Sequence, residues 1–274
     1  LFSILKNCKL YELLEKKLSK IIRVLLPEKN QGLTPNSVAT QNACTGKYIA
    51  LLDGDDYWTS ENKLQLQIDF LEKNLDFSAS SHQAQIVFDD VSGKGGLFGS
   101  EKNEIYTLKD TIQHRKFHTS SLIYRREYWT KTGGIPTTIL SNERAIYPML
   151  AIFGKINYFK ENMCIYRKSS IGISARITSG ELTTDLKMLP WLKNIDNNFP
   201  VYQFRSFLHL CIYTYPIKMR VFPLFINYIQ FYFIHSHILK KVKILHVVVI
   251  QGTFNKYHPK ILFETYEIIR KKMS

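Results

Sequence analysis

The run GKYIALLDGDDYW, Gly46 to Trp58, indicates the fold more clearly than any other stretch of the chain. Its first half, YIALL at 48–52, is an apolar run typical of a strand buried in a parallel sheet. Directly after it stand three carboxylates, Asp53, Asp55 and Asp56. In an open α/β sheet, ligands bind at the carboxyl ends of the strands. The run therefore predicts a ligand site at the edge of such a sheet.

Working outward from this run, hydrophobic periodicity predicts alternating strands and helices. Strands are expected at 21–26, 48–52, 77–88, 118–125 and 155–167, and helices at 1–20, 35–44, 60–74 and 143–153. In the helix at 60–74, Leu64, Ile68 and Leu71 form the expected apolar stripe. The alternation favours an α/β class with a mostly parallel sheet flanked by helices.

The acidic run has a specific chemical use. Carboxylates so close in the sequence repel one another, and a divalent cation relieves that repulsion. Carboxylate oxygens suit Mg²⁺ or Mn²⁺, with phosphate oxygens completing the shell, and Gly54 lets the backbone come close to a ligand. Such a metal neutralises charge on a departing nucleoside diphosphate. A solvated acidic loop is the alternative, whereas the spacing of a calcium loop is absent. His82, His114 and His118 lack metal-ligand spacing, and we expect ordinary core or surface roles for them.

Composition further narrows the classes of protein to which the chain can belong. The chain has 274 residues, 45% of them hydrophobic, and a net charge of +14, which excludes a disordered tail. Its four scattered cysteines exclude a disulfide scaffold or a zinc ribbon. No zinc-finger spacing or RNA-recognition signature accompanies the basic charge, so nucleic acid is not an expected partner.

Much of the positive charge lies late in the chain. Across 182–274, Lys and Arg outnumber Asp and Glu by 13 to 4. Residues 221–239 are aromatic and apolar but contain Pro223, so an amphipathic helix fits better than a membrane span. This helix either packs in a core or, through 221–243 with its lysines, contacts an anionic membrane. We expect a cytoplasmic protein, peripheral at the inner face of the membrane.

With these residues in view, Gly46–Trp58 and the following NKLQLQIDFLEKN resemble the metal-site segment of family 2 glycosyltransferases with the GT-A fold. The resemblance continues through EKNQG, HTSSLIYR, ERAIYPMLAIFGKINYF and CIYRKSSIGIS, over roughly 20–178. It implies a GT-A-like, Rossmann-like domain at 1–180, followed by a basic, aromatic, mainly helical region at 181–274. It also implies transfer of a sugar from a nucleotide-diphosphate donor, such as a UDP-sugar, to an acceptor hydroxyl.

Roles follow from the resemblance position by position. It implies Mn²⁺ or Mg²⁺ on Asp55 and Asp53, and donor contacts from Asp53, Asp55, Asp56, Asn36 and Arg167. Glu143, at the start of a helix, matches the base that activates the acceptor in inverting members. The implied acceptor is a glycan or a lipid-linked glycan, in cell-surface polysaccharide or glycan synthesis. Ser169 stands where the family often has a histidine.

One departure from the family keeps other readings open. Family members begin with two strands that hold the base and ribose, and residues 1–20 offer no counterpart. We therefore expect a member whose N-terminal strands are missing. One alternative is an inactive, truncated remnant of the fold that binds a membrane or a partner. Another is a basic protein that binds nucleic acid or phospholipid and has an incidental acidic turn.

Overall fold

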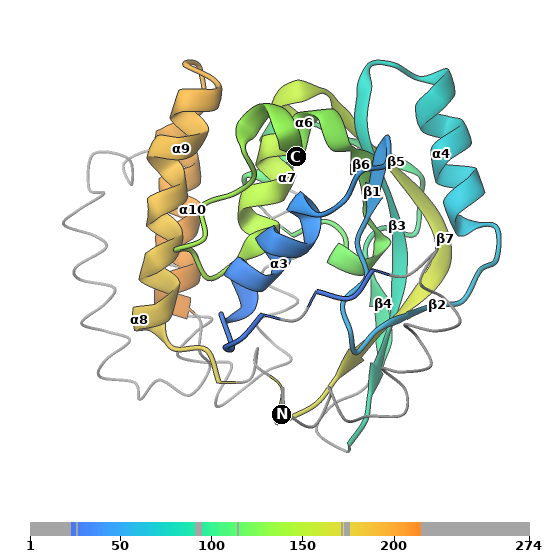
Figure 1. Cartoon of the computed structure of the whole chain (residues 1–274), viewed down its shortest axis with the longest axis horizontal. Helices are drawn as coiled ribbons and strands as arrows, with labels where there is room; N and C mark the ends of the chain where they lie inside the picture. The colour runs from blue at the N-terminus through green and yellow to red at the C-terminus, as the bar shows by residue number, and fades with distance from the viewer. Residues whose placement is uncertain are drawn as a thin grey trace, which may run out of the picture.

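The computed structural model describes residues 23–25, 27–90, 95–113, 115–170, 172 and 176–214. Within them the chain is mixed α/β, with one sheet flanked by helices, as the sequence predicts (Figure 1). The helix expected at 1–20 and the membrane-contacting segment expected at 221–243 lie outside the described residues.

A seven-stranded sheet lies at the centre of the described part. Five of its strands lie side by side in the order β1, β6, β3, β7 and β2, and the other two, β4 and β5, lie off this path. Its strands are β1 (Tyr48–Ala50), β2 (Tyr57–Trp58), β3 (Phe77–Phe88), β4 (Gly96–Phe98), β5 (Glu104–Tyr106), β6 (Ile123–Arg125) and β7 (Lys155–Lys168). The longest ladder joins β3 and β7 in parallel. The shorter ladders on either side, including β1–β6 and β2–β7, are antiparallel. The parallel character of the sheet is thus concentrated at its centre.

Helices cover both faces of this sheet. They are α3 (Leu33–Asn42), α4 (Lys63–Lys73), α5 (Leu108–Thr111), α6 (Arg126–Thr132), α7 (Asn142–Phe153), α8 (Ser179–Leu182), α9 (Met188–Ile195) and α10 (Val201–Thr214), with 3₁₀ turns η1 (Thr119–Ser121) and η3 (Thr183–Lys187). Figure 1 shows α4 on one side of the sheet, and α6 and α7 with α9 and α10 on the other. The two sides are therefore layered as in other α/β proteins.

Most predicted elements are confirmed, and the first strand is not. Strands β3 and β7 and helices α3, α4 and α7 lie where the periodicity places them, and α7 runs through Pro148. Residues 23–25 of the strand expected at 21–26 are exposed and have no regular structure. No described strand pairs with them, so they do not add a strand to the described sheet. The strand expected at 48–52 forms as β1, but it ends at Ala50 and only Ile49 is buried.

The buried face of α4 differs from the predicted apolar stripe. Its buried residues are Lys63, Gln67 and Leu71, four residues apart along one face, whereas Leu64 is 39% exposed. Polar partners explain why Gln67 can be buried on this face. The Gln67 amide donates to the hydroxyl of Ser80 and to the carbonyl of Ser121, so its burial costs no hydrogen bond.

One hydrophobic core joins the sheet to the late helices. Ile146 and Leu150 of α7 lie in the same cluster as Leu189 and Leu192 of α9 and Phe204 of α10. The described helices after residue 180 therefore belong to the core of the α/β part, and the division at that residue stays a prediction. None of the helices in the described ranges has the length and apolarity that a membrane span requires.

Candidate functional site

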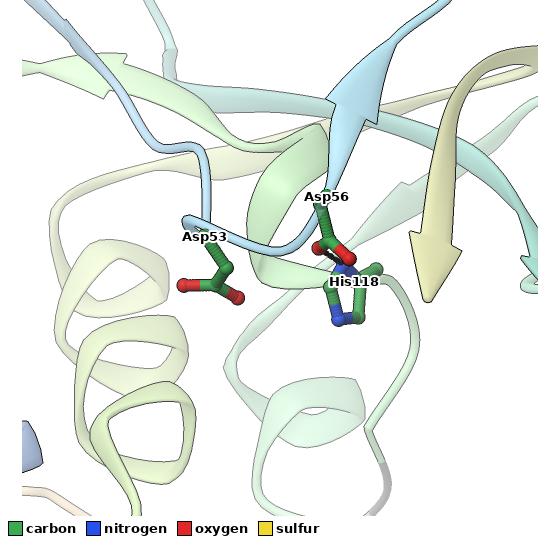
Figure 2. A group of neighbouring side chains, drawn as sticks. All are labelled: Asp53, Asp56 and His118. Atoms are coloured by element: carbon green, nitrogen blue, oxygen red, sulfur yellow. Dashed lines mark ion pairs between the residues drawn. The ribbon is translucent and has the colours of Figure 1, made fainter. Parts of the chain in front are cut away.

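The acidic turn, residues 53–56, follows β1 and is closed by a hydrogen bond from the Asp56 amide to the Asp53 carbonyl at 3.1 Å. Just before the turn, the amide of Leu51 donates to the carbonyl of Leu122 at 3.0 Å. The turn is thus tied to the segment that leads into β6. Figure 2 shows Asp53 and Asp56 on the turn, with His118 beside Asp56.

Asp56 is the buried member of the turn. Its Oδ2 accepts a hydrogen bond from Ser120 Oγ at 2.5 Å, and its Oδ1 accepts one from the Arg167 amide at 2.9 Å. Burial raises the pKa of Asp56, while these two hydrogen bonds act in the opposite direction. Because both oxygens already have protein donors, Asp56 fixes the turn more readily than it reaches a ligand.

Asp53 is the open member. The residue is exposed, although the protein around its carboxylate displaces part of the water there, and its backbone amide donates to Ser120 Oγ at 3.1 Å. Loss of solvation raises its pKa to about 6, and repulsion from Asp56 and then Asp55 adds to the rise. A carboxylate crowded by other carboxylates is stabilised by a cation, so Asp53 is the side chain of this turn best prepared to hold one.

His118 completes the group. One donor atom each from Asp53, Asp56 and His118 can be chosen so that all lie within 4.8 Å of one another. The His118 ring stacks on Tyr166, with ring centroids 3.8 Å apart. Burial, followed by the charges of Arg115 and Lys168, lowers its pKa to about 2. The ring is therefore neutral at physiological pH, although its Nδ1 lies 3.3 Å from Asp56 Oδ2.

This donor set fits a divalent cation. Carboxylates with a neutral imidazole are ligands that suit Mn²⁺, and the raised pKa of Asp53 reflects lost solvation together with crowding by Asp56 and Asp55. Sequence spacing gave no reason to include His118, because 62 residues separate it from Asp56. Only the fold, through the 3₁₀ turn η1, brings the two together.

The structure places the other predicted donor residues differently. Asp55 is exposed and lies beside the group without belonging to it. Asn36 is exposed on α3, where its carbonyl accepts a hydrogen bond from Thr40. The guanidinium of Arg167 pairs with Asp89 through two hydrogen bonds of 3.0 and 2.9 Å, so only its backbone amide contacts the acidic turn.

Glu143 lies half-buried in the first turn of α7. Its negative charge is among those that raise the pKa of Asp53, behind burial and the two other acids of the turn. One helical turn further on, Tyr147 donates to the carbonyl of Phe117 at 3.2 Å and lies 3.4 Å from the hydroxyl of Thr119. The start of α7 therefore packs against the same segment that contacts the acidic turn.

The entry into α7 is fixed from further along the chain. The fully buried carboxylate of Asp185, in η3, accepts hydrogen bonds from the amides of Leu140 and Ser141 at 3.0 and 2.9 Å. It also pairs with Arg144 at 2.9 Å. Three partners satisfy this carboxylate, which holds the backbone before Glu143 and the side chain of the residue after it in place.

Two further residues had no signal in the sequence. Arg115 places its guanidinium 5.2 Å from the ring centroid of Phe98 and 5.8 Å from that of Tyr166, and its charge opposes the rise in the pKa of Asp53. Buried Lys63 lies 4.3 Å from the ring centroid of Trp58. An isolated cation in a polar run carries no recognisable pattern, and only the fold shows what it faces.

The chain is similar in sequence to known proteins. Residues 9–143 match the family model described as Glycosyl transferase family 2. The chain is 27% identical over 162 residues to Uncharacterized protein Rv1520 of Mycobacterium tuberculosis, and equally to Uncharacterized protein Mb1547 of Mycobacterium bovis. These matches cover 56% of this chain and 44% of each relative, so the chain spans less than half of their length.

A search of solved structures returned mannosyltransferase PcManGT from Pyrobaculum calidifontis, in complex with GDP-Man and Mn²⁺. It is 12% identical, with a TM-score of 0.46, and the match covers 92% of this chain and 74% of that protein.

Proposed function

We propose that this member of glycosyl transferase family 2 moves a sugar from a nucleotide-diphosphate donor to an acceptor hydroxyl, with a divalent cation at the acidic turn. The observation that carries the proposal is the group formed by Asp53, Asp56 and His118 after β1. When held at the acidic turn, the cation would neutralise the charge that builds on the leaving nucleoside diphosphate.

The residues of the turn have separate roles in this proposal. Asp53 holds the cation, because the residue is exposed and its carboxylate is crowded by Asp56 and Asp55. Asp55, exposed beside it, is positioned to contribute a second carboxylate or to contact the donor. Asp56 and His118, both buried, complete the donor set. A UDP-sugar is the donor class that we propose, with a glycan or lipid-linked acceptor.

Glu143 is the proposed base. Its carboxylate takes the proton of the acceptor hydroxyl, whose oxygen then forms a bond to the anomeric carbon. The bond from that carbon to the phosphate oxygen breaks, and its electron pair leaves with the nucleoside diphosphate. Attack from the face opposite the leaving group inverts the anomeric centre. The position of Glu143 supports this role, because its negative charge helps to raise the pKa of Asp53.

Calorimetry tests this function before any acceptor is known. UDP, followed by a panel of other nucleoside diphosphates, is titrated into the full chain with and without Mn²⁺. We expect Mn²⁺-dependent binding that Asp53→Asn abolishes and that Asp69→Asn, an exposed acid on α4, leaves unchanged. Absence of binding under every condition would contradict the proposed enzymatic activity and would favour an inactive member of the family.

Asp55→Asn, measured in the same way, separates the two candidate metal ligands. If Asp53 is the main ligand, its substitution weakens binding more than that of Asp55, because Asp55 lies outside the group. The reverse ranking would assign the metal to Asp55, as the family resemblance implies.

A further inference from the structure

We propose that Ser120 is a positioning residue that sets the geometry of Asp53, Asp56 and His118 for metal binding. The inference rests on the proposed function, because it assumes a cation at the acidic turn. Ser120 lies in the 3₁₀ turn η1 and is fully buried, so it cannot itself be the first contact of a ligand. Its effect must pass through the side chains that it holds.

The hydroxyl of Ser120 joins the two ends of the acidic turn. It donates to Asp56 Oδ2 at 2.5 Å and accepts from the backbone amide of Asp53 at 3.1 Å. A serine hydroxyl has one proton and two lone pairs, so both hydrogen bonds form at once. One oxygen atom thereby fixes the buried carboxylate and the backbone of the open one.

The backbone of Ser120 holds two more parts of the site. Its amide donates to His118 Nδ1 at 3.3 Å, and its carbonyl accepts from Trp58 Nε1 at 2.8 Å. Trp58 follows the acidic turn directly, as β2. Every polar group of Ser120 therefore bonds to the acidic turn or to a residue beside it.

The neighbouring serine provides a matched comparison. Ser121 is equally buried, but its hydroxyl donates to the carbonyl of His118 at 2.7 Å. The bond of that hydroxyl is to a backbone carbonyl and not to any of the three carboxylates of the acidic turn. Two adjacent serines with the same burial thus differ in whether their hydroxyls hold the acidic turn.

Removal of the Ser120 hydroxyl has two consequences. It leaves Asp56 Oδ2 without its donor, and it releases the amide of Asp53. A hydrogen bond to a charged group contributes more than a neutral one, so the buried carboxylate is expected to shift toward other donors. A shift of Asp56 or of the Asp53 backbone changes the separation of the ligand atoms. Metal affinity depends directly on that separation.

The test is a Mn²⁺ titration of the full chain, in which electron paramagnetic resonance of free Mn²⁺ gives the dissociation constant. We expect Ser120→Ala to weaken Mn²⁺ binding by about tenfold, equivalent to about 1.4 kcal/mol. Ser121→Ala should bind as the wild type does. Circular dichroism and thermal melting of each variant show whether it is folded. Ser120→Cys, whose somewhat larger thiol donates only weakly, is used if Ser120→Ala does not fold.

Each outcome decides the proposal. Wild-type Mn²⁺ affinity in a folded variant that lacks the hydroxyl would overturn the role of Ser120 and leave the metal site standing. Equal weakening in Ser121→Ala would also overturn it, because the effect would then be general to η1. If the wild-type chain does not bind Mn²⁺, the metal site fails and this inference fails with it. Failure of both Ser120 variants to fold would make Ser120 a folding residue instead.

Discussion

The acidic turn and the start of α7 each present a carboxylate to the candidate site, and they are held in different ways. The acidic turn is fixed by uncharged donors, chiefly the hydroxyl of Ser120 and the amide of Arg167. The start of α7 is fixed by a charged group, Asp185, which pairs with Arg144 and accepts two backbone amides.

The difference also separates the two regions along the sequence. Ser120 lies inside the residues that match the family model, 9–143, whereas Asp185 lies well beyond them. The matched part therefore carries the acidic turn with one of its main supports, but Glu143 depends on a residue outside the match. We expect the start of α7 to be the more fragile of the two regions, because a buried charge that loses its partner is costly.

The largest expected effect is on chemistry at the start of α7. Glu143→Gln should lower sugar transfer by about 10²- to 10⁴-fold, the usual contribution of a general base, and leave UDP–Mn²⁺ binding unchanged. Product formation and calorimetry of the same protein measure the two quantities. Glu127→Gln is the control, since Glu127 is also a first-turn carboxylate, on α6. Equal loss of donor binding would place Glu143 with the acidic turn.

Next is the stability of the same region. Asp185→Ala should lower the free energy of unfolding by about 3–5 kcal/mol, because it leaves Arg144 without its buried partner and two amides without an acceptor. Urea denaturation measures the loss. Asp69→Ala removes an exposed acid and should change little. A loss below about 1 kcal/mol for Asp185→Ala would show that the start of α7 is held by other contacts.

The free energy of unfolding is expected to depend on pH through Lys63, the buried lysine that lies against the ring of Trp58. Burial lowers the pKa of Lys63 from 10.5 to about 8. Between pH 8 and 10.5 the unfolded chain keeps a proton on Lys63 that the folded chain has lost, so the free energy of unfolding rises with pH. Relative to Lys63→Met, the wild type should gain up to about 3 kcal/mol across this window.

Urea denaturation of both proteins at several pH values checks this prediction. Lys73→Met, an exposed lysine on the same helix, should leave the pH dependence of the wild type intact. An unchanged difference between wild type and Lys63→Met across the window would mean that Lys63 titrates normally. The buried charge of Lys63 beside Trp58 would then not lower the free energy of unfolding.

The smallest effect is expected at Arg167. Its side chain forms an exposed ion pair with Asp89, so Arg167→Ala should change the free energy of unfolding little. UDP–Mn²⁺ affinity should not change, because the amide that holds Asp56 remains. A tenfold loss of affinity in calorimetry would show that the guanidinium leaves Asp89 for the diphosphate.

The sequence predicts best where local pattern decides the structure. Periodicity locates β3, β7 and α7, and the acidic turn is visible as a motif after an apolar run. Prediction fails for α4, where Lys63 and Gln67 replace Leu64 on the buried face. Their burial depends on partners such as Ser80 and Trp58, which lie elsewhere in the chain.

The same limit applies to the candidate site. Asp53 is recognisable from its local context, a strand end, whereas Glu143 is a candidate through the family resemblance. His118 and Asp185 are not recognisable in either way, because each acts through a contact with residues more than 40 positions away. Spacing along the chain carries no signal for such contacts. They arise only when η1 and η3 are placed against the acidic turn and α7.

Hydrogen–deuterium exchange of the full chain tests most directly whether the two regions line one site. Exchange is compared with Mn²⁺ alone and with UDP plus Mn²⁺. We predict slower exchange on adding UDP at residues 53–56, at 117–121 and in the first two turns of α7, which contacts 117–121 through Tyr147. Protection of the acidic turn with α7 unchanged would contradict the account, because Glu143 would then lie outside the donor site.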